Sequence, residues 1–501
     1  MRISGKTVVI LGLGRQGTAL AQFMSLRGAR VRVSDMRRED QLSEALAELQ
    51  GFPIEYTLGS HPPSLLRGAD TLYLSGGVPV DTMLAREAIK HGIPLSNDSQ
   101  LFLEFTPCPV VGITGSAGKT TTTALVGEMG KRSQRYRKVW VGGNIGKPLL
   151  ADLDNMGSED LAAMELSSFQ LEIMTASPSV AGVLNITPNH LDRHGTMEAY
   201  IAAKSRILDG QKQGDCAVLG WDDPNVRTLH SRTEGNCWGF SSVPNPAFEN
   251  GCYLVDEMIT VREHDMHDTV SPTSEVRLPG DHNVLNVLAA CALAGAVGVE
   301  VAAMRSAIRE FTGMPHRLEL VRKRHGVLWI NDSIATAPER TVAAINSFND
   351  PIVLLLGGRD KQLPWDELAT LINRRVKCVI LFGEAAGLIE NNLVALHDDP
   401  EYSPADVTGS LPAQSRTPSL DKGPGVKSNL EGSTVGETAT PGPYPPNILR
   451  AAGLNEAVQL AAEVTREGDL VLLSPGCTSF DEFMDFSVRG DRFRELVGGL
   501  S

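Results

Sequence analysis

The stretch VVGITGSAGKTTT, residues 110–122, has the pattern of an apolar strand, a glycine-rich turn and the start of a helix. Backbone N–H groups at such a helix start cradle phosphates, a lysine neutralises their charge and a threonine hydroxyl binds Mg²⁺. Ile113 stands where the strict G-x-x-x-x-G-K-[ST] pattern has its first glycine. An empty glycine turn is the alternative, but the strand, loop, lysine and threonine all favour ATP. The predicted ATP site comprises Gly115, Ser116, Ala117, Gly118, Lys119, Thr120 and Thr121.

A second glycine-rich turn precedes the first, in VVILGLGRQGTAL at residues 8–20. Gly12, Gly14 and Gly17 have the spacing G-x-G-x-x-G, and Asp35 ends the next apolar run. This pattern is typical of a turn that binds a nucleotide diphosphate, and it does not identify the base. An NAD-dependent oxidoreductase is one interpretation, but it leaves the loop at 110–122 without a role.

Composition limits the class of protein. The chain has 501 residues, 42% of them hydrophobic and 21% charged, which indicates a soluble globular protein of about three domains. A net charge of -14 argues against a nucleic-acid partner. The seven cysteines show no C-x-x-C spacing and indicate free thiols in a reducing compartment. No apolar run reaches the roughly 18–20 residues of a membrane span, and the N-terminus leads directly into a strand, so we expect a cytoplasmic enzyme.

Short Val, Ile and Leu runs alternate with helical stretches, which predicts an α/β chain with parallel sheets. Prolines in EFTPCP (104–109) and FTGMPHRLEL (311–320) suggest two boundaries. We expect a Rossmann-like domain at 1–106, a central P-loop ATPase domain at 107–313 and a Rossmann-like domain at 314–501. In the last, the runs at 326–333, 351–360, 378–384 and 469–476 predict strands. The segment 397–446 is rich in Pro, Gly, Ser and Thr, and we predict a disordered, tolerated insertion rather than a regulatory one.

Three further segments carry polar side chains. MELSSFQLE (164–172) places Glu165 after an apolar run, as a magnesium ligand or a general base. NITPNHLDRHGTMEAYIAAKSRIL (185–208) contains His190, Asp192, His194 and Lys204. Spacing alone favours Lys204 as a surface lysine with its stem on the apolar face. LPGDHNVLNVL (278–288) begins a helix with Asn283 and Asn286, which either read an adenine edge or, for Asn283, cap the helix.

Together with GGNIGKPL (142–149), MPHRLE (314–319), INDSIATAPE (330–339) and LSPGCTSFDEFMDFSVRGDRF (473–493), these motifs resemble the Mur ligases. These enzymes are ATP-dependent amino-acid ligases of cytoplasmic peptidoglycan precursor synthesis. The chain is most similar to the branch that adds glutamate to UDP-N-acetylmuramoyl-L-alanine. The resemblance implies an acyl-phosphate intermediate, ATP and two Mg²⁺ ions, a third domain that closes over the site, and a monomer.

The resemblance also implies roles for individual residues. Lys119, Glu165, His190 and Lys204 would be catalytic. Thr120 and Glu165 would bind one Mg²⁺, and His190 and a carbamylated Lys204 the other. ATP would further contact Asn283, Asn286, Arg317 and Asp332. The UDP-sugar would contact Gly14, Arg15, Asp35, Arg37, Gly77, Asn144 and Gln170. Glutamate would contact Thr336, Lys361, Ser479, Phe480 and Phe486.

Three positions depart from the family pattern. Ile334 replaces a lysine beside the expected glutamate pocket, Ser75-Gly76-Gly77 replaces Ser-Pro-Gly, and Met36 replaces a small hydroxyl residue. D-glutamate is the favoured amino acid, with L-glutamate or another acidic amino acid as alternatives. A folylpolyglutamate-type ligase would lack the first domain, and a non-catalytic scaffold would have no reason to keep the Lys119, Glu165, His190 and Lys204 set.

Overall fold

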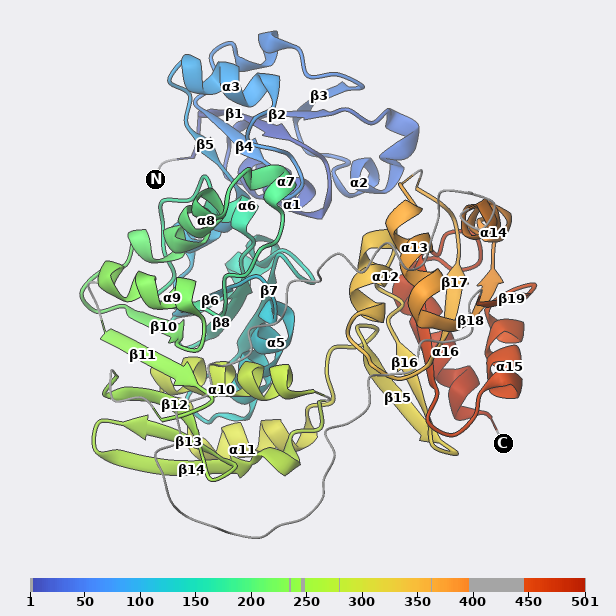
Figure 1. The fold of residues 1–501 in the computed structure, drawn as a ribbon. Coiled ribbons are helices and arrows are strands. Elements are labelled where there is room, and N and C mark those ends of the chain that lie inside the picture. The colour runs from blue at the N-terminus through green and yellow to red at the C-terminus, as the bar shows by residue number, and fades with distance from the viewer. Residues whose placement is uncertain are drawn as a thin grey trace. The chain divides into compact units, whose positions relative to one another are not determined.

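The computed structural model describes residues 3–233, 236–244, 248–278, 280–361, 363–395 and 446–500. The chain forms two compact units, Met1–Phe311 and Thr312–Ser501. Unit 1 contains two β-sheets and unit 2 contains one, each flanked by helices (Figure 1). This arrangement confirms the α/β class with three sheet-containing regions. The first two predicted domains both lie in unit 1.

The first sheet of unit 1 is wholly parallel, with the order β3-β2-β1-β4-β5. Its middle strand β1 is buried along its whole length, as expected when helices cover both faces of a parallel sheet. The strands are β1 Thr7–Leu11, β2 Arg30–Asp35, β3 Ile54–Leu58, β4 Thr71–Leu74 and β5 Leu95–Ser96. The helices are α1 Arg15–Leu26, α2 Ser43–Glu48, α3 Met83–Lys90 and α4 Asp98–Phe105.

The second sheet has nine strands in the order β14-β13-β12-β11-β10-β9-β6-β8-β7. Strands β12 to β14 form an antiparallel extension of the otherwise parallel sheet. The strands are β6 Val110–Thr114, β7 Val139–Gly143, β8 Leu161–Glu165, β9 Val180–Val183, β10 Cys216–Gly220, β11 Asn236–Ser241, β12 Asn250–Val255, β13 Met258–Glu263 and β14 Met266–Pro272. The helices are α5 Lys119–Arg132, α6 Ser168–Leu171, α7 Leu191–His194, α8 Met197–Asp209, α9 Pro224–Arg227, α10 Asp281–Ala296 and α11 Val301–Glu310.

Unit 2 has one six-stranded sheet in the order β15-β16-β20-β17-β18-β19. Its strands are β15 Glu319–Arg324, β16 Val327–Asn331, β17 Ile352–Gly357, β18 Val376–Phe382, β19 Asn447–Arg450 and β20 Leu470–Gly476. Its helices are α12 Pro338–Ile345, α13 Asp366–Arg375, α14 Ala386–Ala395, α15 Leu454–Val464 and α16 Phe486–Gly498. The four predicted strands are confirmed as β16, β17, β18 and β20, and they are mutually parallel. Of the predicted insertion at 397–446, only Pro446 lies within the described residues.

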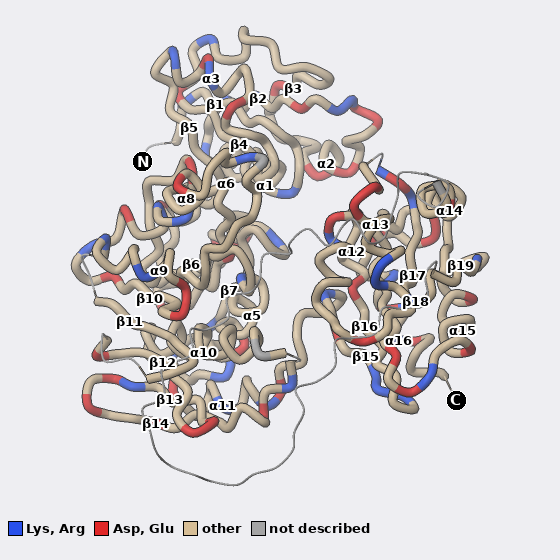
Figure 2. The backbone as a smooth tube through the Cα atoms, viewed as in Figure 1, with Lys and Arg blue, Asp and Glu red and all other residues tan. Residues whose placement is uncertain are grey.

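Charges of both signs are interspersed along the described chain of each unit (Figure 2). All seven cysteines are free, which confirms the prediction of thiols rather than disulfides. Within the described ranges, every helix is too short or too polar to cross a membrane.

Candidate functional site

The phosphate loop joins β6 to α5, as the sequence predicted. Gly118 is the N-cap residue of α5 and has a left-handed backbone with φ +82°. A Cβ atom at Gly118 would lie 2.1 Å from the Oδ1 atom of Asn286 in α10. The loop therefore requires glycine at this position, and Asn286 is in direct contact with the loop. The N-cap residue of α10 is Gly280, so the helix does not use Asn283 as its cap residue.

A carboxylate and a hydroxyl meet beside this loop because β6 and β8 are parallel neighbours. The Thr120 hydroxyl donates to Glu165 Oε2 at 2.7 Å, and the Asn144 amide donates to Oε1 at 2.9 Å. Glu165 is only 2% exposed. A buried carboxylate and an adjacent hydroxyl are oxygen ligands of the kind that Mg²⁺ prefers. In the described part of the chain, no three His, Cys, Asp or Glu side chains gather as a metal site, so a cation here would also need other ligands.

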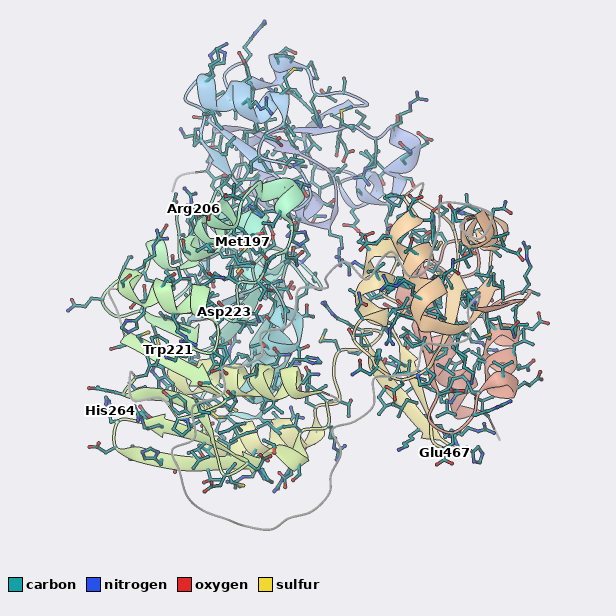
Figure 3. All side chains as sticks on the ribbon, viewed as in Figure 1. Met197, Arg206, Trp221, Asp223, His264 and Glu467 are labelled. Carbon is teal, nitrogen blue, oxygen red and sulfur yellow. The ribbon has the colours of Figure 1, made fainter. Side chains whose placement is uncertain are left out.

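Lys204 belongs to α8, the helix that carries the labelled residues Met197 and Arg206 (Figure 3). Its Nζ atom donates to the Gly115 carbonyl oxygen at 2.8 Å, and Lys119 Nζ donates to the same oxygen at 2.8 Å. Lys204 is 1% exposed, so the interpretation as a surface lysine is wrong. Burial and the nearby Lys119 charge lower the pKa of Lys204 to about 6, against the opposing effect of Glu165. Its amine is therefore largely neutral at pH 7.

His190 is held by an aromatic cluster that the sequence did not reveal. His190 is the N-cap residue of α7 and has a left-handed backbone with φ 53°. Its ring lies 5.3 Å from the ring of Phe169, which stacks on His194 at 5.2 Å. His194 Nδ1 lies 2.9 Å from Glu172 Oε1, and its Nε2 lies 3.0 Å from Ser168 Oγ. The cluster fixes the segment that carries His190. The side chain of Asp192 lies outside the described residues.

The second glycine turn opens onto a cavity of about 520 Å³ within unit 1. The cavity lies where the strands of the first sheet end and is completed by the segment that follows β7. Of the predicted UDP-sugar residues, it is lined by Gly14, Arg15, Asp35, Arg37, Gly77 and Asn144. Residues of the cavity outside the predicted UDP-sugar set include Gln16, His61, Thr82, Gly143 and Pro148.

Gln170 lies elsewhere, in a buried contact between α6 and α4. Its amide donates to the Ser99 hydroxyl at 2.8 Å, and its Oε1 accepts the Ser167 N–H at 2.9 Å. It is not among the residues that line the cavity. In this structure Gln170 forms a capping box with Ser167 and links α6 to α4.

The carboxylate of Asp35 already accepts four hydrogen bonds from N–H groups. Leu13 N–H donates to Oδ2 at 2.7 Å, and the backbone N–H of Arg37 donates to Oδ1 at 2.8 Å. The guanidinium of Arg37 adds bonds to Oδ1 at 3.0 Å and Oδ2 at 2.8 Å. Although burial raises it, these bonds lower the pKa of Asp35 to about 2. A carboxylate has about four acceptor positions, so Asp35 fixes the turn and Arg37 instead of offering a free acceptor to the ribose of NAD.

The predicted residues of unit 2 follow the carboxyl ends of β16, β17 and β20. Asp332 is buried and accepts the Ser474 hydroxyl at 2.9 Å and the Leu318 N–H at 3.1 Å. Burial raises the pKa of Asp332 to about 7, against the effect of these bonds and of Arg317. Lys361 Nζ donates to Thr336 Oγ1 at 3.3 Å. In the sequence between Asp332 and Thr336, the side chain of Ile334 is half-buried.

The segment after β20 contains the remaining predicted glutamate residues. Ser479 is buried, Phe480 is 60% exposed, and Phe486 begins α16. A buried residue that the sequence did not single out, Arg489, supports this segment. Its guanidinium donates to Ser333 Oγ at 2.9 Å and to the Cys477 carbonyl oxygen at 3.2 Å. Arg489 thereby connects the segment after β16 to the segment after β20.

Comparisons with known proteins show which family the chain is similar to. The model of the Mur ligase MurD-like N-terminal domain matches residues 6–97, and that of the Mur ligase middle domain matches residues 113–294. The chain is 37% identical to the UDP-N-acetylmuramoylalanine–D-glutamate ligase of Pelotomaculum thermopropionicum, over 99% of this chain and 98% of that protein. It is 36% identical to the ligase of the same name from Acetivibrio thermocellus, over 100% of this chain and 97% of that protein.

A solved structure has a similar fold. The UDP-N-acetylmuramate–alanine ligase MurC of Thermotoga maritima is 17% identical, with 98% of this chain and 99% of that chain covered and a TM-score of 0.50. At this identity the likeness concerns the fold alone. The full-length identity to the glutamate ligases and the two matched domain models show that the chain belongs to the Mur ligase family.

Proposed function

We propose that this chain is a cytoplasmic, monomeric ligase that joins D-glutamate to UDP-N-acetylmuramoyl-L-alanine with hydrolysis of ATP, in the synthesis of peptidoglycan precursors. One observation carries the proposal. Asn144 lines the nucleotide cavity and donates a hydrogen bond to Glu165, which also accepts a hydrogen bond from Thr120 of the phosphate loop. The cavity and the phosphate loop therefore meet at one carboxylate. The names of the full-length relatives support the same reaction.

The geometry orients the substrate in the cavity. The turn with Gly12, Gly14 and Gly17 would bind the diphosphate, because glycines and the start of α1 allow close approach. On one side the cavity extends to the ends of β2 and β3, and on the other to β4 and Asn144. The reacting carboxylate has to reach the phosphate loop, so it occupies the Asn144 end. The uridine then occupies the end with Arg37 and His61.

A carboxylate is a poor electrophile and has to be activated. Its oxygen attacks the γ-phosphorus of ATP, which yields an acyl phosphate and ADP. The loop N–H groups and Lys119 would stabilise the charge on the transferring phosphoryl group. Two Mg²⁺ ions, one held by Thr120 and Glu165 and one by His190 and carbamylated Lys204, would neutralise charge on the phosphate oxygens when bound. The glutamate amine then attacks the acyl carbon, and phosphate leaves as the amide forms.

The environment of Lys204 supports carbamylation. Its buried amine is largely unprotonated at neutral pH, and a neutral amine is the form that adds to CO₂. Addition gives a carbamate and releases one proton, so a cation becomes an anion with oxygen ligands. That change also removes the repulsion between Lys204 and Lys119, which share the Gly115 carbonyl oxygen.

The remaining predicted residues have roles on the other two substrates. Asn283, Asn286, Arg317 and Asp332 would bind ATP, and the acceptor amine would be placed by Thr336, Lys361, Ser479, Phe480 and Phe486. Lys361 and Thr336 are already in contact and supply a cation and a hydroxyl for a carboxylate. Ile334 provides no charge in the same segment. We propose D-glutamate because the relatives are named for it.

The test is phosphate release from ATP and Mg²⁺ with UDP-N-acetylmuramoyl-L-alanine, with D-glutamate, L-glutamate or D-aspartate added separately. D-glutamate should stimulate release most. Lys119→Ala should abolish it, whereas Lys131→Ala, in an exposed ion pair at the far end of α5, should not. If no amino acid stimulates release, the proposed function is wrong. Stimulation by L-glutamate alone would correct only the choice of amino acid.

A further inference from the structure

His61 lines the nucleotide cavity just after β3, at the end that we assign to uridine. Its ring is half-buried, and Nδ1 lies 2.7 Å from the hydroxyl oxygen of Ser34 in β2. Among the residues that the structure describes, no hydrogen-bond partner of Nε2 is found. One ring nitrogen is thus engaged by the protein, and the other is available to a ligand.

The hydrogen bonds of Ser34 fix which ring nitrogen carries the proton. The Ser34 hydroxyl donates to the carbonyl oxygen of Ser60 at 2.8 Å. A hydroxyl has one proton, so at 2.7 Å the Ser34 oxygen has to accept from His61 Nδ1–H. In the neutral ring the Nε2 atom is then an acceptor. Burial lowers the pKa of His61 below its ordinary value, against the opposing effect of Asp35, so the neutral ring prevails at pH 7 to 8.

Among the described side chains that line this end of the cavity, His61 is the one with a hydrogen-bond acceptor to offer. The carboxylate of Asp35 is saturated by Leu13 and Arg37. Arg37 is a donor only, and Met36 offers no hydrogen-bonding hydroxyl. Uracil presents an N3–H donor between two carbonyl acceptors, whereas cytosine presents a bare N3 acceptor at the same position. An acceptor fixed by the protein therefore distinguishes the two pyrimidines.

We infer that His61 is a specificity-determining residue whose Nε2 accepts the N3–H of uracil, with its tautomer held by Ser34. The inference rests on the proposed function, because it takes the cavity to be the uridine nucleotide site. Cytosine in the same position would place two lone pairs against each other. A buried acceptor left without its donor costs about tenfold or more in affinity.

The experiment measures dissociation constants by calorimetry at pH 7.5 for UDP, CDP and UDP methylated at N3. The unmodified protein should bind UDP at least about tenfold more tightly than either other ligand. His61→Ala should weaken UDP binding about tenfold and reduce the preference for UDP over both ligands to within about threefold. Ser34→Ala should give an intermediate preference, because the ring can then adopt either tautomer. His91→Ala, an exposed histidine paired with Glu87, is the matched control and should behave as the unmodified protein.

The outcomes separate this inference from the proposed function. If the unmodified protein binds neither UDP nor the UDP-sugar peptide, the proposed function fails. If it binds UDP but does not discriminate against N3-methyl-UDP, His61 does not read N3–H, and the function stands. This comparison needs no variant, so a folding defect in His61→Ala leaves the inference testable. An unchanged preference in folded His61→Ala would also overturn it, and an unchanged preference in Ser34→Ala would overturn the tautomer assignment.

Discussion

Lys119 and Lys204 donate to one carbonyl oxygen, that of Gly115 in the phosphate loop. Two ammonium groups this close in a buried site repel each other strongly, and the more buried one gives up its proton more readily. Sequence spacing could not reveal this, because Lys204 lies on a helix far along the chain from Gly115. Arg489 and His61 escaped prediction for the same reason: their partners are distant in sequence, whereas the phosphate loop consists of consecutive residues.

The role of Lys204 gives the first prediction. Lys204→Ala should lower kcat by about 10³-fold, as expected when a charge-stabilising group is lost from a phosphoryl-transfer site. Acetate or formate at high concentration should restore part of the activity, because a small carboxylate can occupy the space of the carbamate. The readout is phosphate release with saturating substrates. Lys212→Ala, exposed beyond the end of α8, is the control and should retain full activity. Full activity of Lys204→Ala without added carboxylate would contradict the prediction.

A buried acid in unit 1 gives a pH-dependent prediction. Asp98, the first residue of α4, is 4% exposed, and its Oδ1 has no partner among the described atoms. Burial raises its pKa from 3.8 to about 7, against two backbone hydrogen bonds. The folded state thus binds the proton more tightly than the unfolded state. Its contribution to stability is complete below pH 3.8 and is lost as pH rises toward 7.

Replacing the acid by its neutral isostere should remove that dependence. Asp98→Asn should raise Tm relative to the unmodified protein at both ends of the range, by less at pH 5 than at pH 8. Calorimetry at pH 5, 6, 7 and 8 measures the difference. Asp40→Asn, at an exposed position, should show no such trend. A difference that stays constant from pH 5 to pH 8 would mean that Asp98 ionises normally in the folded state, and one that falls with pH would contradict the raised pKa outright.

At the scale of elements, strands buried along most of their length carry the clearer sequence pattern. Strands β17 (IVLLLG) and β20 (LVLLSPG) are buried along their whole length and begin with apolar runs. In contrast, β3 (IEYTL) and β14 (MHDTVSP) mix polar and apolar residues, and each lies at a sheet edge. Edge strands need only one hydrogen-bonded neighbour, so their sequences carry a weaker pattern. The glycine turns were predictable because their function depends on consecutive backbone groups. The rest of the nucleotide cavity comes from the ends of several strands.

The turn between β1 and α1 permits a comparison of two glycines. A Cβ atom at Gly17 would lie 1.9 Å from the Gly12 carbonyl oxygen, whereas at Gly14 the nearest atom would be 3.9 Å away. Gly14 has an ordinary φ of −82° that alanine also adopts. Gly17→Ala should therefore lower Tm by several degrees. Gly14→Ala should keep the Tm of the unmodified protein but bind UDP about tenfold more weakly, because the methyl group occupies the path of the diphosphate. Unchanged UDP binding by Gly14→Ala would contradict the assignment of the diphosphate to this turn.

At the scale of the whole molecule, the sequence predicts that the segment 397–446 is a tolerated insertion. Residues 397–445, which precede the described Pro446, should therefore not be needed for folding or catalysis. Replacing them with about eight Gly and Ser residues should keep kcat within about twofold. The shorter connection should lower the entropy cost of closing the loop by about 1.6 kcal/mol, so Tm should not fall. Phosphate release and calorimetry check both statements. A large loss of activity with unchanged Tm would show that the segment takes part in function.

The final prediction concerns the two units during the reaction. Unit 1 carries the phosphate loop, Glu165 and Lys204, and unit 2 carries Thr336 and Lys361, the proposed glutamate residues. An acyl phosphate open to water would be hydrolysed before an amine reached it, so the proposed chemistry requires both units to enclose it. X-ray scattering should show a smaller radius of gyration when UDP-N-acetylmuramoyl-L-alanine and a non-hydrolysable ATP analogue are both bound. Lys119→Ala, which cannot hold the γ-phosphate, should show little change, and Lys131→Ala should respond as the unmodified protein. Identical scattering with and without ligands would mean that the acyl phosphate is protected without closure.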